Sequence, residues 1–268
     1  MKKQFFTLSI LISFLSHSQI KENITYDFSC METDEISFGI NLLSDIEKEL
    51  LNNLGASVSI EEEVEVGDEV YKKFNNENEF YSSSSEERRH LLRIMNKLIR
   101  QLRNPRGFDY EIFIYDKEDE INAFTCGGKI FVTSGMYNFC KSDDELASII
   151  GHEIAHNELG HINQGISRIK TANDFGLAGQ LSYVAGNILT TPFNQKNEAH
   201  CDLLGIDMAI AAGYNGCDNI KLWNRMKEKY DQDYDVVTNI FSTHPYSGKR
   251  MSCSKNHIES NYNTLCPD

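Results

Sequence analysis

Apolar residues recur at helical spacing over most of the chain, which predicts a mostly helical protein. In the clearest stretch, which Ser85 caps, the apolar pattern continues from Leu91 through Leu98 and ends before residue 104. Ser142 and Glu145 form the sequence of a capping box, so a helix is expected to open at residue 143. The predicted helices span residues 36–54, 61–74, 86–103, 143–162, 166–190, 195–212 and 218–230.

Three short strand-like runs, rich in β-branched and aromatic residues, interrupt this pattern. They span residues 110–115, 120–124 and 129–132, and the pair Gly127-Gly128 separates the last two. The predicted fold class is therefore α+β, a mostly helical domain with one small β-sheet. Residues 19–35 are expected to be loosely ordered, and the cysteine-bearing stretch after residue 230 is expected to form a tail.

The first 18 residues have the pattern of an export signal. Lys2 and Lys3 precede an apolar run from Phe5 to Leu15, and Ser16-His17-Ser18 then places small residues where a signal peptidase reads. The run is shorter than the about 20 apolar residues that span a bilayer. A buried N-terminal helix is the alternative. We expect cleavage after Ser18, a mature chain that is periplasmic or secreted, and no transmembrane segment in it.

Charge and cysteine content narrow the classes of partner and compartment. The 40 acidic and 26 basic residues give a formal net charge of −14, which argues against non-specific binding of nucleic acid or of an anionic membrane. Peripheral association with the cell envelope stays open. All seven cysteines follow residue 18, and their odd number leaves at least one thiol unpaired even where disulfides form. Cys217, Cys253 and Cys266 are expected to include a bridge.

The sequence His152-Glu153-Ile154-Ala155-His156 is an H-E-x-x-H motif inside a predicted helix. Residues four apart on a helix share a face about 6 Å apart, so both imidazoles can converge on one zinc ion. Glu153 lies beside the metal, where its carboxylate can accept a proton from water as a general base. Two core or solvated histidines without metal are the alternative, which the apolar neighbours disfavour because the polar groups would be buried unpaired.

A third ligand is available in Glu198-Ala199-His200-Cys201-Asp202, an E-x-x-x-D pattern on a later predicted helix. Glu198 and Asp202 share a helix face, so Glu198 can reach zinc while Asp202 accepts the outer N–H of a ligating histidine, with His152 preferred. A solvated acidic helix edge is the alternative. The sequence thus predicts one Zn²⁺ per chain, bound by His152, His156 and Glu198.

From about residue 60 to residue 251 the chain resembles the HtpX-like and CAAX-prenyl-protease-type zinc endopeptidases of metallopeptidase family 48, a gluzincin group. Besides the two zinc motifs, the resemblance rests on short matches in order: Ile60-Glu61-Glu62-Glu63 with Gly67, Asn122-Ala123-Phe124, Gly127 to Val132, and Ser242-Thr243-His244-Pro245 with Arg250. It implies a zincin-like metallopeptidase domain over 60–268, after a signal peptide over 1–18 and a helical or irregular extension over 19–59. Exported bacterial members act in envelope protein quality control, so polypeptide substrates are expected.

The resemblance also implies roles in substrate binding and catalysis. The strand over 129–132, with Gly128, Lys129, Ile130 and Phe131, is the expected sheet edge on which an extended substrate pairs. Asn122 either holds the substrate backbone or is a turn residue. His244 either donates to the oxyanion of the tetrahedral intermediate or caps zinc as a fourth ligand in a resting state. Arg250 either braces the site or stabilises the same oxyanion.

The remaining histidines are interpreted as non-ligands: His90, His161, His200 and His257. His161 lies five residues beyond His156, about 140° away around a continuous helix. Cys201 stands where this family usually has alanine, and it is either a small buried filler or a thiolate that competes for zinc.

Three classes of function fit these motifs to different degrees. The favoured hypothesis is a zinc metalloendopeptidase that hydrolyses unfolded or misassembled cell-envelope proteins. An envelope chaperone or peptide-binding module with the same groove is the alternative, but binding alone needs no general base at Glu153. A structural zinc protein predicts four protein ligands and no exchangeable water.

Overall fold

The computed structural model describes residues 20–31, 58–172, 177–188, 193–232, 244 and 248–267. The predicted export signal over 1–18 and the predicted helix over 36–54 lie outside the described residues. No helix within the described ranges combines the length and the apolar character needed to cross a bilayer.

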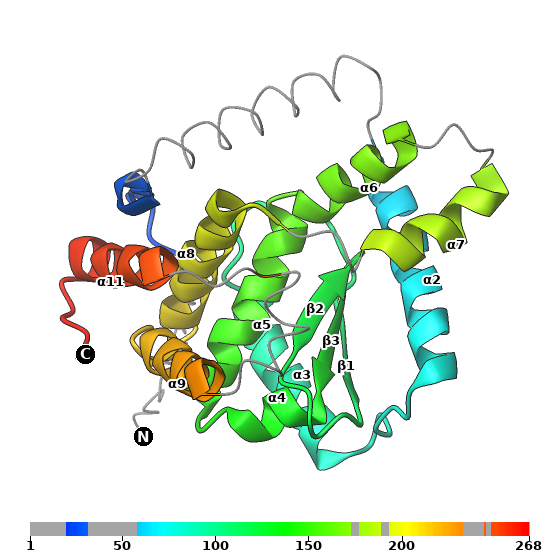
Figure 1. Cartoon of the computed structure of the whole chain (residues 1–268). Coiled ribbons are helices and arrows are strands. Elements are labelled where there is room, and N and C mark those ends of the chain that lie inside the picture. The colour runs from blue at the N-terminus through cyan, green and yellow to red at the C-terminus, as the bar shows by residue number, and fades with distance from the viewer. Residues whose placement is uncertain are drawn as a thin grey trace, which may run out of the picture.

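Most of the described residues are helical, and three short strands complete the regular structure (Figure 1). The helices are η1 (Ser29–Met31), α2 (Ile60–Glu77), α3 (Glu86–Ile99), α4 (Ser134–Phe139), α5 (Asp143–Glu158), α6 (His161–Ala172), α7 (Leu177–Ile188), α8 (Gln195–Ala211), α9 (Asp218–Gln232) and α11 (Gly248–Tyr262). The strands are β1 (Glu111–Tyr115), β2 (Ala123–Cys126) and β3 (Lys129–Thr133). This confirms the α+β class, although β2 starts later than predicted.

The three strands form one sheet in the order β1-β3-β2. The central strand β3 pairs in parallel with β1 and antiparallel with β2. The outer edge of β1 is partly covered, because the N–H of Tyr81 donates to the carbonyl of Ile114 at 2.9 Å. Because β3 has a strand on each side, the prediction that residues 129–132 form a sheet edge is wrong. Within the described part of the chain, β2 pairs on one side only, and it contacts α5.

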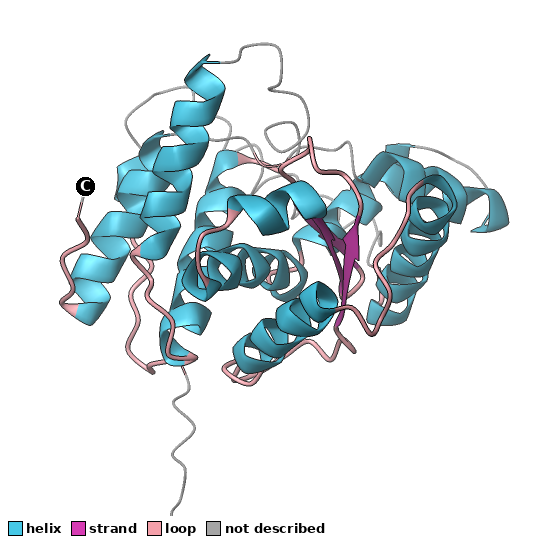
Figure 2. Cartoon of the chain, turned by 90° about the horizontal axis from the view of Figure 1, so that it is seen from below, coloured by secondary structure: helices cyan, strands magenta, loops and turns pink. Residues whose placement is uncertain are grey.

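Both faces of the sheet are apolar, so the sheet is a buried middle layer. One face packs against α3 and α5 and is aliphatic: Ile112, Ile114, Ile130 and Val132. The other packs against α2, α6 and α7 and is aromatic: Phe113, Tyr115, Phe124 and Phe131. Figure 2 shows the strands between the two groups of helices. This arrangement packs α5 against β2 and β3 of the sheet.

The predicted helix over 143–162 is two helices, because the chain turns at Gly160. α5 ends at Glu158, Gly160 has a φ of +73°, and α6 begins at His161. A left-handed φ of this kind favours glycine just after a helix C-terminus. The predicted helix over 166–190 is likewise divided between α6 and α7.

Helices α5 and α8 pack at close range across two glycines. A Cβ atom on Gly151 would lie 3.0 Å from the carbonyl oxygen of Gly205, and one on Gly205 would lie 2.9 Å from the nitrogen of His152. The two backbones are therefore in contact at the turn that carries His152. Such contact allows a short side chain of α8 to reach an imidazole of α5.

Two disulfides connect the C-terminal helix to the rest of the protein. Cys30–Cys253 joins residues 20–31 to α11, and Cys217–Cys266 joins the start of α9 to the residues after α11. The second bridge confirms the expectation for the late cysteines, and three cysteines are free thiols: Cys126, Cys140 and Cys201. The stretch predicted as a tail after residue 230 contains helix α11, so that expectation is wrong. Of the segment predicted to be loosely ordered, residues 20–31 are described, and Tyr26, Phe28, Cys30 and Met31 pack in a core cluster with α8 and α11.

Candidate metal centre

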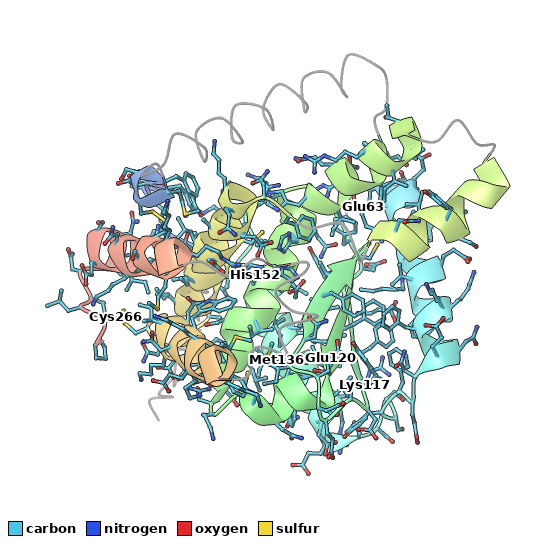
Figure 3. All side chains as sticks on the ribbon, viewed as in Figure 1. Glu63, Lys117, Glu120, Met136, His152 and Cys266 are labelled. Atoms are coloured by element: carbon cyan, nitrogen blue, oxygen red, sulfur yellow. A yellow bond between two sulfur atoms is a disulfide. The ribbon has the colours of Figure 1, made fainter. Side chains whose placement is uncertain are left out.

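The two zinc motifs face each other across the α5–α8 contact. His152 and His156 are one turn apart in α5, and Glu198 lies in the first turn of α8, which the side chain of Asn194 caps. The three side chains are buried, with exposures of 5%, 0% and 0%. Figure 3 labels His152 in the middle of the molecule.

Four donor groups meet there. Nε2 of His152 lies 3.0 Å from Nε2 of His156, and the Glu198 carboxylate oxygens lie 3.4 Å and 3.2 Å from these two nitrogens. Nδ1 of His244 lies 3.3 Å from Nε2 of His152 and 3.2 Å from both oxygens of Glu198. One ligand atom from each of the four residues lies within 4.8 Å of all the others.

This donor set fits a zinc ion. Ligands about 2.0–2.1 Å from a tetrahedral centre stand about 3.3 Å from one another, and the observed separations run from 3.0 to 3.4 Å. Protons alone do not satisfy three imidazole nitrogens and a carboxylate that converge in a buried space, because each imidazole–imidazole contact accommodates only one proton. A divalent cation satisfies all four lone pairs at once.

Asp202 and Arg250 support the ligands from behind. Nδ1 of His152 donates to Asp202 at 2.9 Å, which leaves the lone pair of His152 on Nε2. Arg250, in α11, donates to Asp202 at 2.7 and 2.8 Å, and its Nη1 lies 2.8 Å from Glu198. Burial by itself raises the pKa of Glu198, but the charges of His244 and Arg250 outweigh burial and hold this pKa well below its usual value.

The outer nitrogen of His156 faces two residues that the sequence did not single out for this role. Nδ1 of His156 lies 3.2 Å from Nδ1 of His161, and Sγ of Cys201 lies 3.3 Å from the same atom of His161. Burial raises the pKa of Cys201 well above its usual value, which keeps the sulfur protonated. On a continuous helix His161 would point away, but the turn at Gly160 brings it back. That glycine is the signal in the sequence that predicts the turn.

Glu153 lies beside the donor set without joining it. Its Oε1 is 3.8 Å from Nε2 of His244, and its Oε2 is buried with no hydrogen-bond partner among the described residues. Buried carboxylate oxygens are nearly always hydrogen-bonded, so this exception calls for a functional reason. Burial also raises the pKa of Glu153. The carboxylate is therefore placed to exchange a proton with a molecule held at the donor set.

Most residues that the resemblance assigns to substrate binding are engaged within the fold. Ile130 and Phe131 are fully buried in the central strand, and Nζ of Lys129 lies 2.6 Å from a carboxylate oxygen of α2. The N–H of Gly128 donates to Oδ1 of Asn157 at 3.0 Å. Because β3 pairs on both sides, the expectation that its main chain binds substrate as a sheet edge is wrong.

Asn122 directly precedes β2. Its N–H donates to Oγ1 of Thr133 at 3.1 Å, and its side-chain amide donates to Glu120 at 3.0 Å. Its Oδ1 is buried without a hydrogen-bond partner in the described part of the chain. The residue therefore holds the start of the edge strand and presents one unsatisfied acceptor.

The other three histidines lie away from the four donors. Nε2 of His90 is 2.8 Å from Asp143, and Nε2 of His257 is 2.7 Å from Asp207. The ring of His200 packs edge-on against aromatic rings of the N-terminal segment. These three contacts hold the fold together around the site.

Comparison with known proteins shows which protein family this site belongs to. The family model described as "Peptidase family M48" matches residues 85–257, which include all four donors, Glu153 and Arg250. The chain is 34% identical over 140 residues to the mitochondrial metalloendopeptidase OMA1 of Schizosaccharomyces pombe, covering 48% of this chain and 41% of that protein. It is 24% identical over 199 residues to the metalloprotease LoiP of Escherichia coli, covering 69% and 76%.

A third relative is the beta-barrel assembly-enhancing protease of Yersinia pestis, 26% identical over 168 residues that cover 54% of this chain and 34% of that protein. The chain thus matches less than half the length of this relative and of the OMA1 protein. The match to the family model, in contrast, extends over more than half of the chain and contains the whole donor set. The chain therefore belongs to peptidase family M48, the zinc-dependent metallopeptidases in which the resemblance placed it.

Proposed function

We propose that this chain is a zinc-dependent metalloendopeptidase that hydrolyses peptide bonds of unfolded or misassembled cell-envelope proteins. One observation carries the proposal: Glu153, a buried carboxylate with one oxygen that no described residue hydrogen-bonds, lies directly beside a four-donor set. A purely structural metal site needs no such carboxylate, and leaving it unpaired is unfavourable. Hydrolysis requires a general base at this place.

The residues divide the chemistry among them. His152, His156 and Glu198 would hold a zinc ion, which would supply Lewis-acid chemistry for peptide hydrolysis near neutral pH. Glu153 accepts the proton of the attacking water and delivers it to the leaving amine. Its raised pKa suits both transfers, because burial stabilises the protonated form between them. Asp202 holds His152 in the tautomer that binds metal.

His244 is the donor that changes place during turnover. Catalytic zinc sites keep one position for water or substrate, and four protein donors fill it. Three of these donors belong to the packed helices α5 and α8, whereas His244 belongs to the stretch between α9 and α11. In this proposal His244 closes the site at rest. Displaced from that position, its imidazole would serve as the donor to the oxyanion.

Substrate pairs with the outer edge of β2 rather than with β3. This edge lies next to α5 and follows Asn122, whose Oδ1 has no hydrogen-bond partner among the described residues. Main-chain pairing at a sheet edge has little sequence preference, which suits unfolded polypeptides. The export pattern of residues 1–18 and two disulfides support an oxidising compartment outside the cytoplasm. The name of the Yersinia relative supports an envelope role.

Casein hydrolysis by residues 19–268 tests the proposal. Glu153→Gln is expected to lower turnover by about 10²-fold or more while zinc content stays at one ion per chain. Glu65→Gln, at an exposed position of α2, is the matched control and should keep full activity. A chelator should abolish hydrolysis, and added zinc should restore it. Equal hydrolysis by the Glu153→Gln variant contradicts the mechanism, whereas absence of hydrolysis by the wild-type chain favours a chaperone or peptide-binding module.

The same assay tests His244. His244→Ala should retain zinc, because three ligands remain, and should lower turnover, because the donor to the oxyanion is lost. Unchanged turnover contradicts both roles of His244. If His244→Ala loses zinc as well as turnover, the site is instead a structural one with four protein ligands.

A further inference from the structure

We infer that His161 is a positioning residue for the ligand His156, a role that rests on the proposed zinc site. Nδ1 of His161 lies 3.2 Å from Nδ1 of His156, on the side opposite to the nitrogen that faces the other donors. The two ring centroids are 5.2 Å apart and the rings are inclined by 70°, so the contact is between ring nitrogens rather than between stacked faces. Both residues are buried, with exposures of 5% and 0%.

The proton between these two nitrogens decides whether His156 can bind metal. A neutral imidazole carries a single proton. When this proton is on Nδ1 of His156, His161 accepts it in a hydrogen bond and Nε2 of His156 offers its lone pair to zinc. When His161 instead carries a proton on Nδ1, it donates to His156, whose own proton then occupies Nε2 and points at the donor set. His156 can therefore bind zinc only when His161 is in the tautomer whose Nδ1 carries no proton.

The two ligand imidazoles are held by different chemistry. Behind His152 stands the carboxylate of Asp202, which only accepts hydrogen bonds and so enforces the metal-binding tautomer. Behind His156 stands a neutral ring that can either accept or donate. A hydrogen bond to an ionised group is also roughly twice as strong as one between neutral groups. His161 thus controls the less firmly held of the two imidazoles.

Cys201 contacts the same nitrogen of His161. Its Sγ lies 3.3 Å from Nδ1 of His161 and is fully buried. A thiol is a weak donor, so it competes with His156 for the single lone pair of His161. Removing the thiol removes this competitor of His156 for the lone pair. The positioning role therefore belongs to His161, and loss of the sulfur should not weaken zinc binding.

Zinc affinity, measured by competition with a chromophoric chelator, tests this inference in residues 19–268. His161→Asn and His161→Leu form a matched pair, because asparagine and leucine have the same branched shape and only asparagine carries an acceptor oxygen. His161→Leu is expected to bind zinc about 10–100-fold more weakly than wild type. His161→Asn should recover most of that loss, and Cys201→Ala should bind at least as tightly as wild type. Unfolding of the metal-free variants in urea reports on folding separately.

Three results overturn the inference. The first is an affinity of His161→Leu equal to that of wild type. The second is zinc binding that is equally weak in the Asn and Leu variants. If His161→Leu does not fold, weak zinc binding by His161→Asn alone overturns the inference. The third is a thiolate-to-cobalt charge-transfer band in the cobalt-substituted protein that disappears in Cys201→Ala, which would make Cys201 a ligand. A wild-type chain that binds no zinc overturns the proposed function itself, which is a separate outcome.

Discussion

Arg250 pairs with two buried carboxylates of the site, the zinc ligand Glu198 and its neighbour Asp202, so its loss should show how the site is stabilised. Its guanidinium lies 2.7 and 2.8 Å from the oxygens of Asp202 and 2.8 Å from Glu198. Exposures are 1% for Arg250, 2% for Asp202 and 0% for Glu198, so water does not replace the lost charge. Arg250→Met keeps an unbranched apolar side chain in the space over Trp223, which the guanidinium now covers at 4.8 Å. The substitution isolates the loss of charge.

Breaking a buried ion pair by removing one partner costs about 3–5 kcal/mol. We expect Arg250→Met to lose this much unfolding free energy in the presence of a chelator. In excess zinc the loss should be smaller, because the bound ion supplies positive charge next to Glu198. Urea unfolding followed by circular dichroism, with and without zinc, measures both values. Because domains are typically stable by about 5–15 kcal/mol, the variant should still fold.

Arg225→Met is the matched control. Arg225 makes two contacts of 2.6 Å with Glu145, but its side chain is 28% exposed and it lies away from the donor set. Because Arg225 is partly exposed, solvent screening weakens this pair, so Arg225→Met should cost less than Arg250→Met even though Glu145 is buried, and zinc should not change the effect. The reasoning is refuted if Arg250→Met loses no more than Arg225→Met in chelator. It is equally refuted if zinc leaves the loss at Arg250 unchanged.

Two further predictions concern the framework around the site. Gly205→Ala places a Cβ atom 2.9 Å from the backbone nitrogen of His152, so it should separate α5 from α8, cost about 1–3 kcal/mol and weaken zinc binding in a chelator competition. Gly186→Ala, whose Cβ would meet only Nζ of Lys73 at 3.8 Å, is the control, and equal zinc affinity of both variants contradicts the packing argument. Joint replacement of Cys217 and Cys266 by serine opens a loop with a sequence separation of 49 and should lower stability by about 4 kcal/mol. The control Cys140→Ser should leave the unfolding temperature nearly unchanged. If the double serine variant unfolds at the same temperature as Cys140→Ser, the bridge does not stabilise the protein.

The sequence by itself determined the features that depend on neighbouring residues. The helix start predicted at Ser142 is confirmed, because Oγ of Ser142 accepts from the N–H of Glu145 at 3.3 Å and α5 begins at Asp143. Only half of the predicted capping box forms, since the Glu145 carboxylate accepts from the N–H of Lys141 at 2.7 Å rather than from that of Ser142. A spacing of four residues fixes two side chains on one helix face whatever surrounds the helix, so His152 and His156 had to lie together. The same rule placed Glu198 and Asp202 on one face of α8. These are consequences of the helical repeat.

Only the tertiary structure decided how the helices and strands meet. Alternating apolar residues mark a strand but not its neighbours, which is why β3 was expected at the edge and lies in the centre of the sheet. Helical spacing likewise directed His161 away from zinc, whereas the turn at Gly160 brings it to His156. Arg250 reaches Glu198 because α11 packs on α8, and a disulfide ties α11 to the N-terminal segment. The period of apolar residues along the chain specifies which face of a helix or strand is buried. Which of these faces pack together depends on contacts between residues far apart in sequence.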